Sequence, residues 1–495
     1  MDDMNTLPGM LATVAKQNAG RTAIVDGGAA ISYAVLERRV AALTAALCRA
    51  GVRQGDRVAL LLPNGLNFII GYMAIVSAGA IVVPLDDRYQ QRELVHFLDE
   101  SGVSLLITSQ DLAPLCDQVL SMRGSSCKLF RIDAREEASE IALIPSGNIG
   151  IQINPDTPVM YQFSSGSTGR PKRIARTHAN LLFELDSLIH TLNITNEDRF
   201  LGVTPFSHVN GLVRSMMASI RAGATLFTLA RFERQIVADV IEKNTVSIFI
   251  GVPFMFAMLA KANFRRRPDF SSLRLCASAS APMPKTINQE FFQKFGMYVR
   301  QLYGSSETGT ISVNLSSDIE ASLESVGTPI AGVEVEVLTE NRGVANAGQM
   351  GEFAVKSPAA IEGYNGLAGL NRESFRNGYF LTGDLGWRNS DGLLYLVGRK
   401  KFLINKGGYK IQPGEVEEVL ESHPKVEEAA VIGVPTPFGD EKVKAVIVLN
   451  VPCTEEEIVE YCRGKIADFK IPSVVEFREA LPKTPTGKIR RDHLM

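Results

Sequence analysis

The sequence predicts an α/β protein with a large N-terminal domain of parallel β-sheets covered by helices and a small α+β domain at its carboxyl end. Three observations support this fold class. The chain has 495 residues, which is too many for one compact core. Short apolar runs alternate with helical patterns as far as about Gly332, as they do in parallel strands joined by crossover helices. Beyond that point the pattern changes, first to alternating strands and then to a stretch rich in lysine and glutamate.

The first group of elements follows a β-α-β-α-β order. The run "RVALLLP" at residues 57–63 indicates a buried strand, a helical pattern continues through Ile75, and "AIVVP" indicates the next strand. A polar helix is expected at residues 91–100 and a further strand at residues 104–108. This order predicts a parallel sheet covered by helices.

One uncharged run could be either a membrane span or part of the buried core. Residues 68–85, "FIIGYMAIVSAGAIVVPL", approach the length of a membrane span. However, Gly79 divides the run, and Pro84 lies in its β-branched end. We therefore predict a helix, a turn and a buried strand, and no membrane span.

The same alternation returns later in the chain. We expect a helix at residues 179–192 and strands at residues 157–163, 246–251, 272–278 and 297–304. Ligands gather outside the carboxyl ends of parallel strands. The loops after Phe163, Ser278 and Tyr303 are therefore expected to form one shared site.

The carboxyl-terminal part has a different texture. "GVEVEVL" and "GEFAVKS" alternate as antiparallel strands do, with glycine turns between them. Farther on, "EEVLESH", "VEEAAVIGV" and "VKAVIVL" are expected to be the parts of a compact β-α-β unit. We place a domain boundary at residues 399–401, which gives domains at residues 1–400 and 401–495.

Composition excludes several classes of protein. The formal net charge is -2, so nothing indicates a nucleic-acid partner. Six scattered cysteines without metal or redox-pair spacing favour a reducing, cytoplasmic setting. The acidic start lacks the pattern of a secretory signal.

The stretch "QFSSGSTGRPKRI" at residues 162–174 suggests a phosphate-binding loop. It is not the common P-loop, because Pro171 stands where the second glycine should be and Arg173 replaces the hydroxyl residue after Lys172. Gly166 and Gly169 would still allow backbone N–H groups to converge on an anion. A flexible surface turn is an equally good interpretation of this stretch taken alone.

Further motifs accompany this loop in a fixed order. They are "TPFSHVNGL" (204–212), "ASASAP" (277–282), "YGSSETG" (303–309), "YFLTGDLG" (379–386), "GRKKFLINKGGYKIQPGEVE" (398–417) and "PKTPTGKIRR" (482–491). In this combination the chain resembles the adenylate-forming (ANL) superfamily, which includes acyl-CoA synthetases, peptide-synthetase adenylation domains and firefly-type luciferases. The resemblance spans nearly the whole chain and implies the fold of that superfamily, with a mobile C-terminal domain.

The resemblance implies a two-step reaction. A carboxylate attacks the α-phosphorus of ATP, pyrophosphate leaves and an acyl-adenylate forms; a thiol then takes the acyl group and AMP leaves. The nucleotide-binding residues it implies are Ser164, Ser165, Gly166, Ser167, Thr168, Gly169, Lys172, Ser278, Ala279, Ser280, Gln301, Tyr303, Gly304, Ser305, Ser306, Asp384 and Arg399. Among them, Tyr303 would offer a flat face to adenine, Gln301 its amide to the edge of the base, and Asp384 a carboxylate to the ribose diol.

Three residues are expected to carry the chemistry. By resemblance, Glu307 would hold Mg²⁺, which prefers carboxylate and phosphate oxygens. Lys488 would neutralise the charge that gathers between the α-phosphate and the attacking carboxylate, and His208 would lie between the acid and the thiol. Without the motifs, these residues would be interpreted as a solvated carboxylate, a basic tail and a structural histidine.

The thiol step is expected to need a domain movement. Lys488 would occupy space that the thiol must reach, and the hinge implied by the resemblance falls on Lys401. Lys406, Gly407 and Gly408 would then help to form the tunnel for the pantetheine arm.

The acid pocket is expected to contain His208, Val209, Asn210, Gly211 and Ala279. An asparagine in an apolar pocket needs a partner, which hints at an aromatic or otherwise polar-substituted acid, although a water would satisfy Asn210 equally well. The expected reaction is thus an ATP-dependent acid–CoA ligation with ATP, Mg²⁺ and CoA. The alternative is a stand-alone enzyme that loads the acid onto the phosphopantetheine thiol of a carrier protein. The acid itself and the oligomeric state are left open.

Overall fold

The structure is a computed structural model that describes residues 4–123, 127–132, 151–164, 172–406, 409–436, 441–484 and 487–495. The chain forms two compact units. Unit 1 comprises Met1–Glu334 and Val355–Phe380, and unit 2 comprises Val335–Ala354 and Leu381–Met495. The domain boundary expected between residues 400 and 401 is the position of a hinge. The two compact units do not test where a hinge lies, so this boundary stays a prediction.

The first sheet of unit 1 has the strand order β6-β5-β3-β4-β7-β8. All neighbouring pairs described are parallel except β7 and β8, which are antiparallel. The strands are β3 (Arg57–Leu61), β4 (Ile81–Leu85), β5 (Leu105–Ser109), β6 (Lys128–Ile132), β7 (Pro158–Ser164) and β8 (Lys172–Thr177). Helices α3 (Leu66–Ser77), α4 (Gln91–Ser101) and α5 (Ala113–Arg123) connect its parallel strands. The predicted β-α-β-α-β order is confirmed to within a few residues.

The uncharged run at residues 68–85 has the structure that was predicted for it. It forms most of α3, a turn in which Gly79 has φ +71°, and the fully buried strand β4. Among the described residues, no helix is both long and apolar enough to cross a membrane.

The second sheet of unit 1 carries the remaining predicted strands. Its order is β15-β14-β13-β12-β11-β9-β10-β1-β2, with parallel pairing from β13 to β1 and antiparallel pairing at both ends. The strands are β1 (Thr22–Asp26), β2 (Ala29–Ser32), β9 (Arg199–Gly202), β10 (Thr225–Thr228), β11 (Ile248–Gly251), β12 (Leu275–Ser278), β13 (Arg300–Ser305), β14 (Gly309–Val313) and β15 (Ser325–Pro329).

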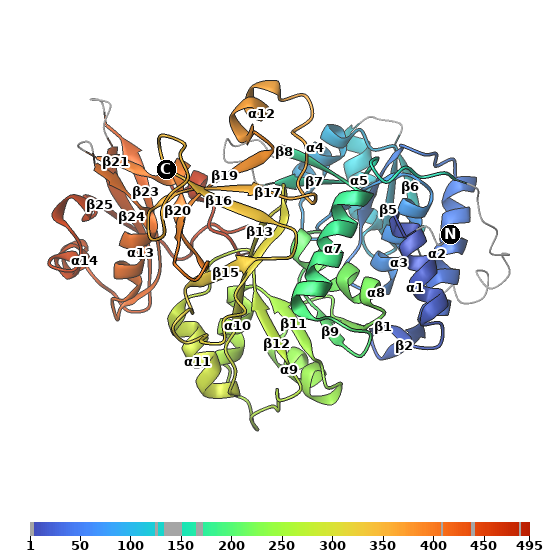
Figure 1. Cartoon of the computed structure of the whole chain (residues 1–495), viewed down its shortest axis with the longest axis horizontal. Coiled ribbons are helices and arrows are strands. Elements are labelled where there is room, and N and C mark those ends of the chain that lie inside the picture. Colours follow the sequence, from blue (N-terminus) through green and yellow to red (C-terminus); the bar gives the residue numbers. More distant parts are fainter. Residues whose placement is uncertain are drawn as a thin grey trace. The chain divides into compact units, whose positions relative to one another are not determined.

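Helices pack on this second sheet and fix its central strands. They are α1 (Leu7–Gln17), α2 (Tyr33–Arg49), α7 (His178–Leu192), the π-helix η2 (Asn210–Met217), α8 (Ala218–Ala222), α9 (Arg234–Lys243), α10 (Pro253–Ala260) and α11 (Lys285–Phe295). Figure 1 shows α9, α10 and α11 beside β11 and β12. Phe249 of β11 and Cys276 of β12 are buried there with Phe256, Phe291 and Phe295 of the helices. This close packing makes the ends of β11 and β12 a rigid support for a site.

Four strands lie mainly in the first part of unit 2. Strands β16 (Glu334–Leu338), β17 (Gly351–Lys356), β19 (Tyr379–Arg388) and β20 (Leu394–Arg399) are neighbours in that order. The segment between β17 and β19, with α12 (Ala368–Ser374) and β18 (Phe375–Arg376), belongs to unit 1.

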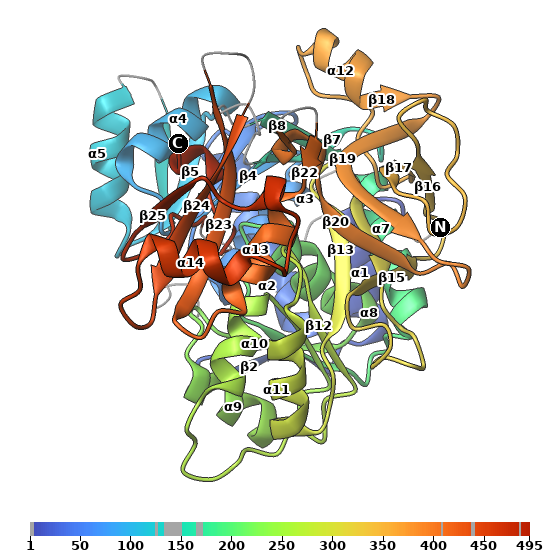
Figure 2. The ribbon, with the colours of Figure 1, turned by 90° about the vertical axis from the view of Figure 1, so that its left-hand side faces the viewer.

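The last part of the chain corrects one prediction. The runs expected to be parts of a β-α-β unit form α13 (Pro413–Glu421), β23 (Val426–Pro435) and β24 (Glu441–Leu449), and the two strands are antiparallel. The actual crossover runs from β24 through α14 (Glu455–Cys462) to β25 (Val474–Phe477), which lies parallel to β24. Figure 2 shows this sheet with α13 and α14 beside it. The smaller elements are η3 (Lys400–Phe402), β21 (Ile404–Lys406), β22 (Tyr409–Ile411), η4 (Asp468–Lys470) and η5 (Arg491–His493).

Candidate active site

The carboxyl ends of three neighbouring strands lie in register and define the candidate site. Gly251 of β11 is paired with Ser278 of β12, and Ser278 is paired with Gln301 of β13. Asn210, the first residue of η2, donates through Nδ2 to the Gly251 carbonyl oxygen at 3.2 Å. The loops expected to share a site after Ser278 and Tyr303 therefore do lie side by side, and η2 joins them.

Two buried polar side chains at this edge of the sheet, one from the predicted acid pocket and one from the predicted nucleotide-binding residues, have an oxygen without a described hydrogen-bond partner. Asn210 is 3% exposed and Ser278 is 1% exposed. Asn210 Oδ1 and Ser278 Oγ make no hydrogen bond to any residue that the structure describes. Buried polar groups are normally satisfied, so these two oxygens are suited to a group that a bound ligand supplies.

Gly211 is required where it stands. A Cβ at this position would lie 2.3 Å from the Thr204 carbonyl oxygen and 2.4 Å from that of Pro205. Only glycine allows η2 to begin so close to the turn that carries His208. The motif "TPFSHVNGL" thus has a steric reason for its glycine.

The turn at residues 303–309 packs against backbone and charged groups on its inner side. A Cβ at Gly304 would meet the Gly309 carbonyl oxygen at 2.3 Å and Arg214 Nη2 at 2.5 Å. Gly309 has φ +71°, and a Cβ there would lie 2.4 Å from Glu184 Oε2. The Ser305 hydroxyl accepts from the backbone N–H of Thr308 at 3.2 Å. The turn is therefore held by its own bonds and by buried side chains beneath it.

Those buried side chains form a charged cluster that the sequence analysis missed. Arg176 of β8 and Glu184 of α7 are completely buried and lie 2.9 Å apart, from Nη2 to Oε2. Glu184 Oε1 accepts from the N–H and the hydroxyl of Thr310, both at 2.8 Å. Arg214 of η2 donates through Nε to Thr310 Oγ1 at 2.9 Å. The cluster joins the strand after the phosphate loop, the acid-pocket helix and the strand after the turn at residues 303–309.

The charges in this cluster stabilise one another. Burial would raise the pKa of Glu184, but Arg176 and Arg214 outweigh it and hold that pKa below its ordinary value. Burial lowers the pKa of Arg214 to about 10, partly offset by Glu184, so this guanidinium stays charged at neutral pH. Two cations and one anion leave a net positive charge beneath the turn.

Glu307, the predicted magnesium ligand, is oriented by a tyrosine that was also missed. The Tyr364 hydroxyl donates to Glu307 Oε1 at 2.9 Å. Lys172 Nζ lies 5.1 Å from the centroid of the same tyrosine ring. Tyr364 therefore links the carboxylate to the lysine that follows the phosphate loop. The sequence gives little indication of this role, because Tyr364 is simply an aromatic residue between Gly363 and Gly366.

Other predicted nucleotide residues lie in the same region of unit 1. Tyr303 is 7% exposed, and Ser280 adopts a left-handed backbone conformation with φ +76°, a strain typical of functional sites. The amide of Gln301 already accepts from Met283 N at 3.0 Å and donates to the Leu323 carbonyl oxygen at 2.7 Å. Its predicted contact with the edge of adenine would require one of these bonds to be exchanged, and stays a prediction.

His208 lies on a turn that side chains from the first sheet hold in place. Asn64, which follows β3, donates to the Thr204 carbonyl oxygen at 2.9 Å and accepts from Phe206 N at 2.7 Å. Gln162 of β7 donates to the Ser207 carbonyl oxygen at 3.3 Å. Side chains at the carboxyl ends of the first sheet thus hold the turn that carries His208, for which a catalytic role is predicted.

The predicted phosphate loop is only partly described. Ser164 ends β7 and Lys172 begins β8, and the two residues are paired. Ser165, Gly166, Ser167, Thr168 and Gly169 lie outside the described residues, so their expected roles stay predictions.

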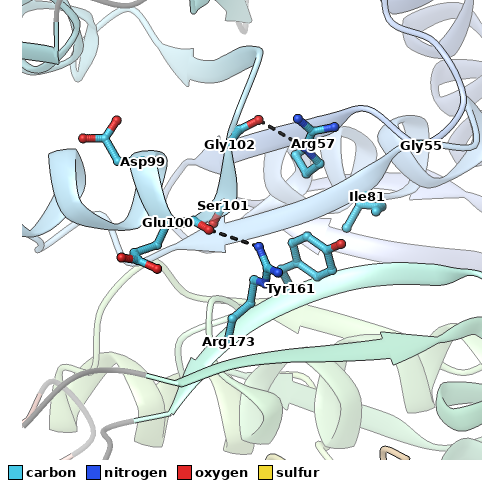
Figure 3. A pocket seen from close by; sticks show the side chains of 9 residues that line it. All are labelled: Gly55, Arg57, Ile81, Asp99, Glu100, Ser101, Gly102, Tyr161 and Arg173. Atoms are coloured by element: carbon cyan, nitrogen blue, oxygen red, sulfur yellow. Dashed lines mark hydrogen bonds between the residues drawn. The ribbon is translucent and has the colours of Figure 1, made fainter. Parts of the chain in front are cut away.

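Arg173 anchors the described end of β8. Its guanidinium carbon lies 4.8 Å from the centroid of the Tyr161 ring, and its Nη1 donates to the Glu100 carbonyl oxygen at 3.1 Å. Figure 3 shows these groups in a surface pocket of about 400 Å³ at the end of α4. Because the pocket lies where β3 and β4 begin, at Arg57 and Ile81, it is not at the carboxyl ends where ligands gather.

Unit 2 carries the other predicted residues. Asp384 and Arg399 are paired across β19 and β20, and Arg399 Nε donates to Asp384 Oδ1 at 2.7 Å. The residues predicted to contact the ribose are thus adjacent. Lys401 lies in η3 with its Nζ 4.3 Å from the centroid of the Phe402 ring. Lys406 ends β21, whereas Gly407 and Gly408 are outside the described residues.

Lys488 lies in a tight turn of unit 2. Its backbone N–H donates to Thr484 Oγ1 at 3.1 Å, and its carbonyl oxygen accepts from Thr484 N at 2.7 Å. Gly487 before it has φ +82°. The Lys488 side chain is exposed on unit 2, and its catalytic role stays a prediction.

Comparisons with known proteins give the same assignment as the motifs. Residues 11–365 match the AMP-binding enzyme family, and residues 415–488 match the AMP-binding enzyme C-terminal domain. Feruloyl-CoA synthase of Amycolatopsis sp is 33% identical over 96% of this chain and 95% of its own length. Oxalate–CoA ligase of Arabidopsis thaliana is 31% identical over 99% of this chain and 98% of its own.

Solved structures agree. O-succinylbenzoate CoA synthetase of Bacillus subtilis, in complex with its acyl-adenylate intermediate, superposes with a TM-score of 0.87 at 29% identity over 98% of this chain and 97% of its own. The same enzyme has been solved with ATP and a magnesium ion, with a TM-score of 0.86 at 28% identity over 98% of both chains. The chain therefore belongs to the AMP-binding enzyme family and, within the adenylate-forming superfamily, is an acid–thiol ligase of the acyl-CoA synthetase type.

Proposed function

We propose that this enzyme adenylates a carboxylic acid that carries a hydrogen-bond donor, such as a hydroxylated aromatic acid, and transfers the acyl group to CoA. The observation that carries the choice of acid is the pair of buried oxygens without partners, Asn210 Oδ1 and Ser278 Oγ. Asn210 Oδ1 is an amide carbonyl oxygen and can only accept a hydrogen bond, and the bond from Nδ2 to the Gly251 carbonyl oxygen fixes the orientation of the amide. A phenol or amine on the acid would satisfy it directly, whereas an aliphatic chain offers it no hydrogen-bond donor.

The unpaired oxygen provides the selectivity. A site built to bond a hydroxyl rejects the analogue that lacks it, because the buried group then stays unsatisfied. Leaving one such group unpaired costs about 1–3 kcal/mol. We therefore expect a preference of roughly tenfold or more for the hydroxylated acid.

In the first step, the acid carboxylate approaches the α-phosphate, and the enzyme must neutralise two anions. We assign this to Lys488, which would bring its charge to the developing transition state. Ser164 to Gly169 and Lys172 would bind the departing pyrophosphate, Ser306 the α-phosphate, and Asp384 with Arg399 the ribose. Support comes from the pairing of Asp384 with Arg399 and from the position of Lys172 at the start of β8.

Glu307 is a suitable ligand for Mg²⁺. Its carboxylate is a hard oxygen donor of the kind the ion prefers, and the bond from Tyr364 to Oε1 fixes its orientation. The ion would neutralise phosphate charge when bound. Glu307 would hold it, with Tyr364 keeping the carboxylate turned in one direction.

The acceptor is proposed to be free CoA. The relatives described above are CoA ligases by name, and the sequence "GGYKIQPGEVE" at residues 407–417 resembles that of CoA-using relatives more than that of carrier-protein loaders. The alternative acceptor is the phosphopantetheine thiol of a carrier protein. Rates with CoA and with a phosphopantetheinylated carrier protein distinguish the two.

Pyrophosphate exchange with a panel of acids tests the proposed substrate class. The panel contains ferulate and its matched analogue without the phenol hydroxyl, together with oxalate and a long-chain fatty acid. We expect exchange with ferulate to exceed exchange with its analogue by about tenfold or more in kcat/KM. Equal exchange with the two, or a preference for the fatty acid, would refute the role given to Asn210. Asn210→Leu should abolish the preference, because it removes the acceptor and keeps the volume similar.

A further inference from the structure

A buried carboxylate lies beside His208, at the end of β4. Asp86 follows Leu85 directly, and its side chain is 1% exposed. Arg88 holds both of its oxygens, through Nε to Oδ1 and through Nη2 to Oδ2, each at 2.7 Å. Burial would raise the pKa of Asp86, but the hydrogen bonds and the charge of Arg88 hold it below its usual range. Asp86 is therefore an anion at neutral pH.

The same carboxylate faces the turn that carries the histidine. Its Oδ2 accepts from the Ser207 hydroxyl at 3.3 Å and lies 3.3 Å from His208 Nε2. Nε2 is buried and makes no well-directed hydrogen bond to any described residue. Such bonds are commonly loose before substrate binds, and a turn of the ring would direct Nε2–H onto Oδ2.

The surroundings leave the imidazole little freedom to move away from Asp86. Asn64 and Gln162 fix the backbone of the turn from the ends of β3 and β7. The remaining charges nearby are already paired: Arg88 with Asp86 itself, and Asp87 with Arg231 at 2.7 Å. Among the residues that the structure describes, Asp86 is thus the carboxylate that lies within hydrogen-bonding distance of His208.

We propose that Asp86 is a positioning residue that fixes the tautomer of His208. This inference rests on the proposed function, in which His208 lies between the acid and the thiol. With the proton held on Nε2 toward the carboxylate, Nδ1 carries the lone pair, because the bond at one ring nitrogen decides the state of the other. His208 is then a base ready for the thiol step.

The thiol sulfur attacks the acyl carbon of the adenylate, and its proton passes to His208 Nδ1. The bond from the acyl carbon to the phosphate oxygen breaks, and AMP leaves with that electron pair. Asp86 stabilises the imidazolium that forms, and the proton returns to solvent after the thioester departs. The adenylation step makes no demand on this base.

The test separates the two half-reactions. Adenylation is measured by pyrophosphate exchange, and thioester formation by single turnover of preformed adenylate with CoA, using ferulate or the acid of the panel that exchanges fastest. Asp86→Asn is compared with two controls. Asp87→Asn makes the same change one residue away, and Arg88→Gln removes the ion pair but keeps the carboxylate. We also combine Asp86→Asn with His208→Gln.

We expect Asp86→Asn to slow thioester formation about tenfold or more, out of the 10²- to 10⁴-fold that a general base contributes. Adenylation should change less than about threefold, which also shows that the variant folds. Arg88→Gln and Asp87→Asn should slow the thiol step less. In the His208→Gln background, Asp86→Asn should have little further effect, because residues that act as a unit are not additive.

Two results would overturn the inference alone: equal losses in both half-reactions, or additive losses in the double variant, since both indicate a role that does not pass through His208. If the wild-type enzyme forms adenylate but no thioester with CoA, the proposed acceptor is wrong, and this inference falls with it.

Discussion

Removing the charge of Glu184 should destabilise unit 1 by about 3–5 kcal/mol. Glu184→Gln keeps the shape of the side chain but leaves Arg176 and Arg214 buried without their anion. Arg176 is 0% exposed, and its Nε and Nη1 have no other described partner. Two charges about 4 Å apart at an effective dielectric constant near 20 interact by about 4 kcal/mol. Breaking a buried pair by removing one partner costs about 3–5 kcal/mol.

The assay is chemical denaturation followed by circular dichroism. The single tryptophan, Trp387, lies in unit 2, so its fluorescence would report on the wrong unit. The matched control is Glu290→Gln on the exposed side of α11, which should change stability by less than about 0.5 kcal/mol. A loss of less than about 1 kcal/mol for Glu184→Gln would refute the reasoning.

The pH dependence gives a second check on the same residue. The pKa of Glu184 is depressed in the folded protein, so its stabilisation is complete above the ordinary carboxyl pKa of about 4.3. It is lost as the pH falls below that value toward the folded pKa. The difference between wild type and Glu184→Gln should therefore be constant at neutral pH and shrink below about pH 4. A difference that grows on acidification would contradict this sign.

Four further outcomes are expected. Lys488→Ala should slow adenylation by roughly 10²- to 10³-fold while thioester formation from supplied adenylate largely survives; equal losses would show that the lysine is not specific to the first step. Lys401→Pro should spare adenylation more than thioester formation, measured as separate half-reactions, and a uniform loss would argue against the hinge. Gly309→Ala places a Cβ 2.4 Å from Glu184 at φ +71° and should lower stability by at least about 1–2 kcal/mol; an unchanged denaturation midpoint would contradict that contact. Arg173→Gly removes a contact with the Tyr161 ring and a charged hydrogen bond, which together contribute about 2 kcal/mol. It should raise the KM for ATP several-fold with little change in kcat, and Arg173→Lys should have an intermediate KM. An unaltered KM would mean that Arg173 does not position the predicted phosphate loop.

The parallel strands and their helices were predictable because the signal is local. A short, continuous apolar run such as Ile81–Leu85 indicates a buried strand, because a helical pattern and a glycine turn precede it. The expected β-α-β unit at the carboxyl end was wrong because β23 ends at Pro435 and β24 begins at Glu441, a connection too short for a crossover. A parallel crossover needs a dozen or more residues, so β23 and β24 had to be antiparallel.

Sequence motifs supplied the candidate site residues, whose roles stay predictions, but not the buried charges beneath them. Glu307, Asp384 and Lys488 stand in recognisable stretches, whereas Arg176 and Glu184 do not. Their pairing depends on β8 and α7 meeting, which no local spacing indicates. One signal was available: Glu184 interrupts the apolar face of α7 between Leu181 and Leu188, and all three are buried. A carboxylate at a core position implies a buried cation.

The most direct test of the central claim uses ATP labelled at the α-phosphate, incubated with the enzyme, Mg²⁺ and the preferred acid in the absence of CoA. We predict an enzyme-bound labelled acyl-adenylate that is converted to labelled AMP and acyl-CoA when CoA is added. Label found only in ADP, or an adenylate that forms equally well without the acid, would contradict the account.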